Sequence, residues 1–363
     1  LMNKKAVIWL ANELQKPILK LTEDDYNNHG MAQLATEKGP VYNINIDIFN
    51  KVQHTITGWP GGKPNADDSQ RPERAEPAKK RVIIFSPHPD DDVISMGGTF
   101  IRLADQGHDV HVAYQTSGNT AVWDDDALRF VEFALDFTKS INCDPEQLEE
   151  LYSSMRTFMK NKLPNQVDTS EIQTVKGLIR KGEAIAGARF AGLPDDHIHF
   201  MALPFYERAK TQKRAVSEDD IQQTMDLLQQ VRPHQIFAAG DFADPHGTHK
   251  VCFDIMLEAF TRLAKTEEWT KDCWIWLYRG AWHEFETHEI EMAVPLSPQE
   301  VMRKRYAIFK HQSQKDRPVF PGDDEREFWV RAEDRTKETA RSYDKLGLAE
   351  YEAMEAFVRW KFD

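Results

Sequence analysis

Short apolar runs along the chain alternate between the periods of strands and helices. Residues 82–86 read Val-Ile-Ile-Phe-Ser, a β-branched and aromatic run that is typical of a strand buried in a parallel sheet. Residues 93–106 then place their large apolar side chains largely on one helical face, and strand character resumes at 110–114. This succession of strand, helix and strand predicts a right-handed crossover between parallel strands.

The same alternation continues along the second half of the chain. Further helices are predicted near residues 174–191, 219–231 and 248–263, and further strands near 198–203, 235–239, 274–278 and 282–294, with covering helices after Pro298. The pattern predicts an α/β fold, with a Rossmann-like, mostly parallel sheet flanked by helices and a short N-terminal appendage.

A proline-rich stretch separates the front of the chain from the rest. Residues 59–80 contain four prolines and almost no large apolar residue, which indicates a linker. The apolar clusters before it are too few for an independent core, so we expect this segment to pack on the main domain or on something outside this sequence. The predicted organisation is a segment at 1–64, a linker at 65–80 and a main domain at 81–363.

Composition narrows the class of protein. Hydrophobic residues make up 40% of the 363 positions and charged residues 29%, which is ordinary for a globular protein. The net charge of −13 argues against nucleic-acid binding, which needs clustered Lys and Arg. No window approaches the roughly 20 apolar residues of a membrane span, so no membrane partner is expected. Three widely spaced cysteines fit a reducing cytoplasm.

Two polar loops carry the candidate chemistry, and each follows a predicted strand. His88 and Asp91 lie three residues apart on the first loop, and His249 lies on the second. Because ligands bind at the carboxyl ends of strands in open α/β sheets, we expect these three side chains to face one ion. Two imidazoles and one carboxylate with an open position suit catalytic Zn²⁺, and they leave Fe²⁺ as another divalent candidate.

Asp90 and His246 are the candidate catalytic residues beside this metal. Asp90 is free to act as general base toward the zinc-bound water and later to protonate the departing amine. His246, one helical turn before His249, is placed to hydrogen-bond the developing oxyanion. Asp92 is expected to cap the following helix, and the His and Glu residues of 283–288 are expected on the exposed face of a strand.

Residues 80–315 resemble the LmbE-like, or PIG-L, family of N-deacetylases, which act on N-acetylglucosaminyl conjugates. The first loop of that family reads His-Pro-Asp-Asp, as this chain does at 88–91. The resemblance implies that His88 and Asp91 bind zinc and that Asp90 is the base.

Three further motifs belong to this resemblance. The second loop of the family commonly reads His-Pro-Asp-His, with its last His on zinc and its first near the oxyanion, whereas residues 246–249 read His-Gly-Thr-His. Arg180 begins a match to the family's Arg-x-x-Glu-Ala helix, and residues 311–314 match its late His-x-Ser-Gln. We expect Arg180 to contact a phosphate or hydroxyl group of the substrate.

Residues 6–64 carry a second resemblance, to the tail of long bacterial glucosamine-6-phosphate deaminase-like proteins. It rests on Lys-Pro-Ile-Leu-Lys-Leu-Thr at 16–22 and on the stretch 53–64, which ends in Trp-Pro-Gly-Gly-Lys-Pro. In those proteins a sugar-phosphate isomerase-type domain precedes an LmbE-like domain. The resemblance implies that this chain is the carboxy-terminal part of such a protein, fused to or associated with a deaminase-like domain, and it leaves a homo-oligomer open.

The predicted function is zinc-dependent hydrolysis of the N-acetyl group of an N-acetylglucosamine-type amino sugar, phosphorylated or not, with release of acetate and the free amine. One alternative is a non-catalytic phosphosugar-binding or regulatory module of a deaminase-like protein. The other is a non-haem iron oxygenase, because His88 and Asp90 with a distant His also match its facial triad. The alternating α/β pattern disfavours the oxygenase, whose sites usually lie in β-sandwich barrels.

Overall fold

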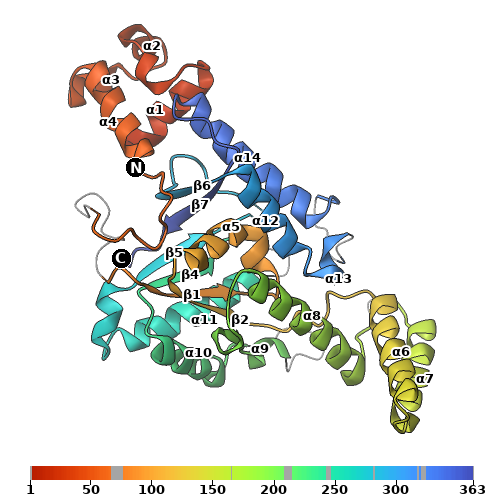
Figure 1. The fold of residues 1–363 in the computed structure, drawn as a ribbon. Coiled ribbons are helices and arrows are strands. Elements are labelled where there is room, and N and C mark those ends of the chain that lie inside the picture. The colour runs from red at the N-terminus through yellow and green to blue at the C-terminus, as the bar shows by residue number, and fades with distance from the viewer. Residues whose placement is uncertain are drawn as a thin grey trace.

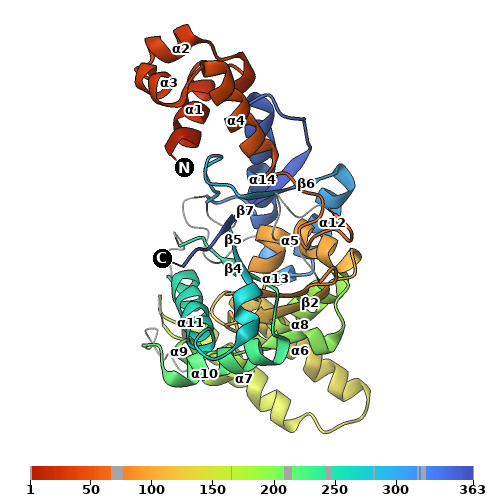
Figure 2. The same ribbon diagram turned by 90° about the vertical axis from the view of Figure 1, so that its left-hand side faces the viewer.

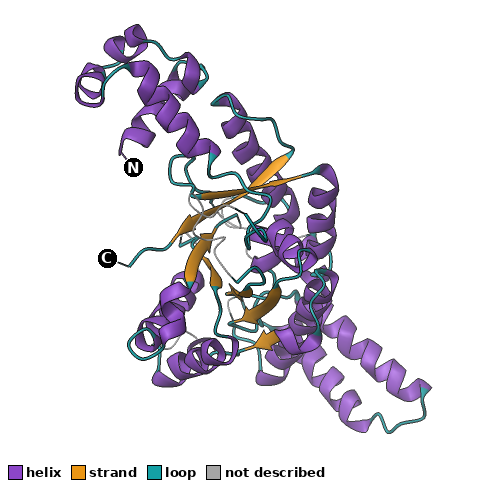
Figure 3. Ribbon diagram, turned by 60° about the vertical axis from the view of Figure 1, so that its left-hand side comes forward, coloured by secondary structure: helices purple, strands orange, loops and turns teal. Residues whose placement is uncertain are grey.

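A seven-stranded sheet with helices on both faces forms the body of the protein (Figure 1 and Figure 3). The computed structural model describes residues 2–66, 77–164, 166–207, 215–242, 247–280, 283–316, 319 and 324–362. Among the helices of these residues, none combines the length and apolar character that crossing a membrane requires.

The strands follow the order β3-β2-β1-β4-β5-β7-β6. The first five strands in this order run parallel to one another, and β7 is antiparallel to both of its neighbours, so the predicted α/β fold with a mostly parallel sheet is confirmed. The strand bounds are β1 Arg81–Ser86, β2 Asp109–Tyr114, β3 Ile198–Phe200, β4 Gln235–Ala239, β5 Trp274–Tyr278, β6 Met292–Leu296 and β7 Ala353–Arg359.

Two groups of helices cover the two faces of the sheet (Figure 2). One face packs against α5 Asp91–Asp105, α8 Ser170–Phe190, α12 Pro298–Ile308 and part of α14 Phe328–Lys345. The other packs against α10 Glu218–Val231 and α11 Thr248–Leu263. The short helices α9 Pro204–Glu207 and α13 Gln312–Lys315 lie beside these layers, and a helical hairpin, α6 Asp124–Ser140 and α7 Glu146–Asn161, projects from the body (Figure 1).

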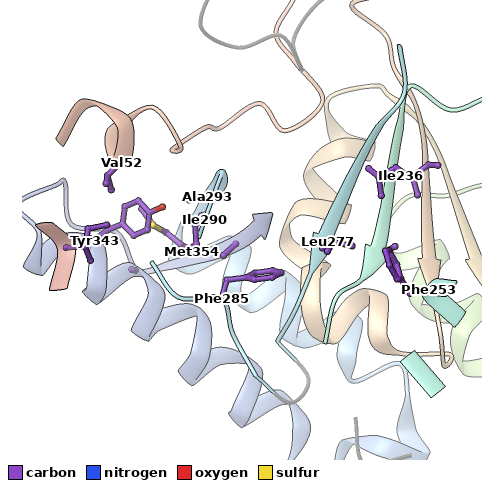
Figure 4. Close-up of a cluster of buried hydrophobic side chains, with 14 of the residues drawn as sticks. Val52, Ile236, Phe253, Leu277, Phe285, Ile290, Ala293, Tyr343 and Met354 are labelled. Carbon is purple, nitrogen blue, oxygen red and sulfur yellow. The ribbon is translucent and has the colours of Figure 1, made fainter. Parts of the chain in front are cut away.

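The N-terminal segment folds into a small helical lobe that packs on the sheet domain. It contains α1 Met2–Glu13, α2 Glu23–Asn28, α3 Ala32–Lys38 and α4 Val41–Gln53. The buried cluster drawn in Figure 4 runs from Val52 past Tyr343 and Met354 to the central strands. The Thr55 Oγ1 and Tyr343 hydroxyl oxygens lie 2.7 Å apart, and Ala293 N donates to Thr55 O at 2.8 Å. Of the two expectations for this segment, the structure therefore shows packing on the main domain.

The domain boundaries at 1–64, 65–80 and 81–363 stay predictions, and residues 67–76 of the predicted linker lie outside the described part of the chain.

The strand predicted at 282–294 is wrong over most of its length. Residues 283–290 form turns and irregular structure, and β6 begins only at Met292. Side-chain carboxylates replace strand partners here, since Asp241 accepts from His283 N at 2.8 Å and Glu289 accepts from Glu286 N at 3.0 Å. The alternating polar pattern therefore reflects an irregular segment whose amides are bound by acidic side chains.

Candidate active site

The two polar loops meet where the strand order of the sheet reverses. One loop follows β1 and the other follows β4, and these parallel neighbours pair in register from Val82 with Gln235 to Ile84 with Phe237. The chain enters α5 from the first loop and α11 from the second. Since β1 and β4 lead to helices on opposite faces, their carboxyl ends define the crevice in which open α/β sheets bind ligands.

His88, Asp91 and His249 converge in this crevice as a potential metal site. Each offers one ligand atom, and the three atoms all lie within 4.8 Å of one another. Asp91 Oδ2 lies 3.1 Å from His88 Nδ1 and 3.2 Å from His249 Nε2. Ligands about 2.0–2.2 Å from a tetrahedral zinc ion are roughly 3.4 Å apart, so the donor set and its spacing fit zinc.

The charge balance of the site also suits a metal ion. Asp91 and His249 are buried, and the His88 side chain is about one-fifth exposed. Burial alone would raise the pKa of Asp91, but His249 and His88 outweigh it and hold the pKa of that carboxyl well below its usual range. Asp91 is thus ionised, as a metal ligand must be.

Hydrogen bonds and prolines fix the first loop. Ser86 Oγ donates to the carbonyl of His88 at 2.6 Å, and the His88 amide donates to Asp91 Oδ2 at 2.9 Å. Thr116 Oγ1 donates to the carbonyl of Pro87 at 2.7 Å. Because proline also restricts the backbone, the loop holds His88 and Asp91 in place at low entropic cost.

The second loop enters α11 through a left-handed residue. Gly247 has φ 63°, a conformation that side chains with a Cβ rarely adopt, and Thr248 and His249 form the first turn of the helix. This turn presents His249 to the first loop. His246 lies outside the described residues, so its role at the oxyanion stays a prediction.

Asp90 lies beside His88 and Asp91 and is not part of the three-residue cluster. It is buried, and its Oδ1 lies 3.1 Å from Arg180 Nη2. Burial raises the pKa of Asp90, although the charge of Arg180 acts in the opposite direction. A raised pKa makes the Asp90 carboxylate a stronger proton acceptor, as a general base requires.

Arg180 reaches the site from α8 and is only 1% exposed, so it is no solvated surface charge. Its Nη2 faces Asp90, while its Nε and Nη1 have no hydrogen-bond partner among the described residues. A buried guanidinium with free donors is costly unless an acceptor binds it. Arg180 can therefore bind both the Asp90 carboxylate and an oxygen of a bound molecule.

Two sequence motifs that lie far apart join behind Arg180. The Glu183 carboxylate accepts from the amide and the hydroxyl of Ser313, both at 2.7 Å. His311 is completely buried against Gly187, and burial together with the charge of Arg180 lowers the pKa of His311 to about 3. These contacts fasten α8 to α13 and fix the position from which Arg180 extends.

Tyr206 is a site residue that the sequence did not reveal. Its ring stands edge-on to His88 with 6.4 Å between centroids, and its hydroxyl oxygen lies 3.2 Å from Thr120 Oγ1. Burial raises the pKa of Tyr206 to about 12, so the hydroxyl keeps its proton. No motif marked it, because its place depends on the path of the chain after β3.

Asp92 does not cap the helix as expected. Asp90 occupies the N-cap position of α5, and Asp92 lies inside the first turn. Its carboxylate is buried and accepts from the Tyr114 hydroxyl at 3.0 Å, and burial raises the pKa of Asp92 to about 7. The Asp92 side chain therefore points into the protein, where its bond to Tyr114 links the turn after β1 to β2.

Comparison with known proteins places the site in a family. Residues 83–260 match the family PIG-L, described as GlcNAc-PI de-N-acetylase. These residues form a PIG-L family domain, and the resemblance to LmbE-like proteins is thereby confirmed. The description of that family names a de-N-acetylation, which is the hydrolysis of an N-acetyl amide.

The chain is also similar to one longer protein. It is 55% identical over 360 residues to a glucosamine-6-phosphate deaminase-like protein from Bacteroides thetaiotaomicron. The match covers 98% of this chain and 54% of that protein, so the chain spans about half the length of the curated relative it matches.

Two solved structures are more distantly similar. One is the N,N'-diacetylchitobiose deacetylase from Pyrococcus horikoshii, at 20% identity, with 77% of this chain and 84% of that chain covered and a TM-score of 0.48. The other is GalB, the 4-carboxy-2-hydroxymuconate hydratase from Pseudomonas putida, at 16% identity, with 78% and 97% covered and a TM-score of 0.48.

Proposed function

We propose that the protein removes the acetyl group from an N-acetylglucosamine-type amino sugar, with Zn²⁺ held by His88, Asp91 and His249. The convergence of these side chains next to the buried, non-ligating Asp90 supports this most strongly. When bound there, zinc supplies Lewis acidity toward the amide carbonyl and lowers the pKa of water to about 7. The iron oxygenase alternative has no support in the strand-to-helix setting of His88.

Residues of the chain carry out the proton transfers and the binding of the substrate. Asp90 accepts a proton from the attacking water as the water oxygen bonds to the carbonyl carbon, and it returns the proton to nitrogen as the carbon–nitrogen bond breaks. Acetate and the free amine leave. Arg180 holds the Asp90 carboxylate in place and offers its free donors to a substrate oxygen. His246 is proposed to donate to the oxyanion.

A phosphorylated sugar and a deaminase-like neighbour are part of the proposal. The name of the Bacteroides thetaiotaomicron relative supports a substrate of the glucosamine-6-phosphate type and an association with a deaminase-like domain. Arg180 would supply a cation for such an anionic substrate in a chain of net charge −13. A cytoplasmic location would fit this metabolism.

Acetate release tests the proposed function directly. Purified protein supplied with Zn²⁺ is incubated with N-acetylglucosamine, its 6-phosphate and short N-acetylglucosaminyl conjugates, and acetate and primary amine are measured in parallel. We expect equal amounts of both products from at least one substrate, and a chelator should stop the reaction. If the zinc-bound protein releases acetate from none of these compounds, the proposal is refuted.

Arg180→Lys should lower kcat/KM by about 10- to 100-fold. Lysine keeps the charge but loses the fork of donors, so charge-assisted hydrogen bonds of about 1.5–3 kcal/mol are lost. Arg189→Lys on the same helix is the matched control, since Arg189 is exposed and pairs only with Asp195 among the described residues. A rise in KM would show that Arg180 binds the substrate, and a fall in kcat would show that it positions Asp90. Unchanged kinetics would show that Arg180 has neither role.

A further inference from the structure

A second group of metal-ligating side chains lies on strands β2 and β3. Asp109 and His111 are two residues apart on β2, and His197 and His199 are two residues apart at β3. The parallel register pairs Val112 with Ile198, which sets His111 beside His197 on one face of the sheet. Asp109, His111 and His197 each offer a ligand atom, and these atoms lie within 4.8 Å of one another.

The contacts among these residues are close. The rings of His111 and His197 stack with 4.0 Å between centroids. Asp109 Oδ1 lies 3.6 Å from His111 Nε2 and 3.6 Å from His197 Nδ1. The His111 Nε2 separation approaches the roughly 3.4 Å between two ligands of a tetrahedral zinc ion. Because the two rings are nearly parallel, at 15°, the His197 ring must turn out of the stack for its Nε2 to reach the same ion.

The hydrogen bonds of the cluster leave one nitrogen of each of two imidazoles with a lone pair for a metal. His197 Nδ1 lies 2.9 Å from the carbonyl of Val110, which can only accept, so Nδ1 carries the hydrogen and Nε2 keeps its lone pair. His111 Nδ1 lies 3.0 Å from His199 Nε2, and a hydrogen on His111 Nδ1 leaves its Nε2 free toward Asp109. Imidazoles that bind metals usually donate their other nitrogen in this way.

The charge of the cluster favours a cation. Within the described residues, Asp109 forms no ion pair with Lys or Arg. Its contacts of this kind are with the imidazoles of His111 and His197. Burial, with smaller contributions from His197 and His199, lowers the pKa of His111 to about 4, so this ring is neutral at physiological pH. A partly buried carboxylate beside neutral imidazoles is stabilised by a divalent ion.

We propose that Asp109, His111 and His197 form a second binding site for a divalent transition-metal ion of the zinc class. Their side chains are 31%, 13% and 24% exposed, so an ion can enter from solvent and keep water in its open positions. Imidazole with carboxylate suits zinc, nickel and copper.

This site is separate from the candidate active site. Asp109 pairs with Arg81 at the start of β1, whereas His88 follows the end of that strand. A bound ion would join the three-residue edge strand β3 to β2. The chain after β3 continues to Tyr206, whose ring packs against His88. The ion would therefore stabilise the position of the segment that carries Tyr206.

Zinc titration of the metal-free, full-length chain tests the proposal. Isothermal titration calorimetry and elemental analysis after dialysis should find one zinc equivalent fewer in His111→Ala/His197→Ala than in the unaltered chain. His54→Ala is the matched control, because His54 is exposed and distant in sequence from both sites, and it should bind as much zinc as the unaltered chain. The double variant should still release acetate if the proposed function is correct.

The conservative Asp109→Asn variant keeps the test decisive if the double variant folds poorly. It should lower zinc affinity at the second site by at least about tenfold, while circular dichroism stays unchanged. In Asp91→Asn, which damages only the candidate active site, the second equivalent should persist. Equal zinc stoichiometry and affinity in the unaltered chain, the double variant and Asp109→Asn would overturn the proposal.

Discussion

Asp90→Asn is expected to lower kcat for acetate release by about 10²- to 10⁴-fold without loss of zinc. General acid–base catalysis contributes rate factors of this size, and an amide can neither accept the water proton nor return it to the amine. Asp90 is not one of the three converging ligands, so the metal site should stay intact. Steady-state acetate release and zinc content of the same preparation measure both effects.

Two controls make the Asp90 result interpretable. Asp125→Asn removes an exposed carboxylate from the first turn of α6 and should change neither rate nor zinc content. Substrate affinity of Asp90→Asn should be nearly unchanged, because the neutral side chain can still hydrogen-bond Arg180. Turnover within threefold of the unaltered protein would rule out Asp90 as the base. Sugar binding without acetate release in both proteins would instead favour a phosphosugar-binding module over a hydrolase.

The central part of the fold could be predicted from the sequence because its signals are local. The apolar run of β1 and the amphipathic α5 each span a few consecutive residues, and a strand-loop-helix unit fixes where its loop lies. The same reasoning applied to β4 and α11 brought His249 to the first loop. Residue types that bind metals, placed on two such loops, therefore predict a metal site without knowledge of the remaining packing.

Features that depend on contacts between residues far apart in the chain could not be predicted from the sequence. Lys304 Nζ lies 2.7 Å from Glu355 Oε1 in the core, and each side chain is 1% exposed. Lys and Glu usually lie at the surface, so residue type alone would place both side chains there. The carboxylate also accepts the amides of Gly98 and Thr99 in α5. Only the position of β7 in the sheet brings these partners together, and nothing in the local pattern of Glu355 indicates it.

The second histidine cluster shows the same limit. Asp109 and His111 resemble ordinary polar residues of a strand, and so do His197 and His199. The two pairs are 88 residues apart, measured from His111 to His199, and meet only because β3 adds to the edge of the sheet beside β2. Tyr206 depends on that pairing too, since it follows β3.

His249→Ala should abolish zinc binding at the candidate active site and reduce acetate release to background. Loss of partners in the outer shell of a metal site already costs about 10- to 100-fold in affinity, and loss of one of three protein ligands should cost more than about 100-fold. The change removes an imidazole that is 2% exposed at the start of α11 and leaves Asp91 with His88 alone. Zinc content after dialysis and acetate release at saturating substrate are the measurements.

The outcome at His249 separates the two metal sites. One zinc equivalent should remain in His249→Ala, because Asp109, His111 and His197 are untouched, whereas His111→Ala/His197→Ala should lose the other equivalent and keep its activity. High added zinc should restore little turnover to His249→Ala, since the ion would lack the geometry set by the α11 turn. A His249→Ala protein that keeps all its zinc and its acetate release would place the catalytic metal elsewhere in the chain.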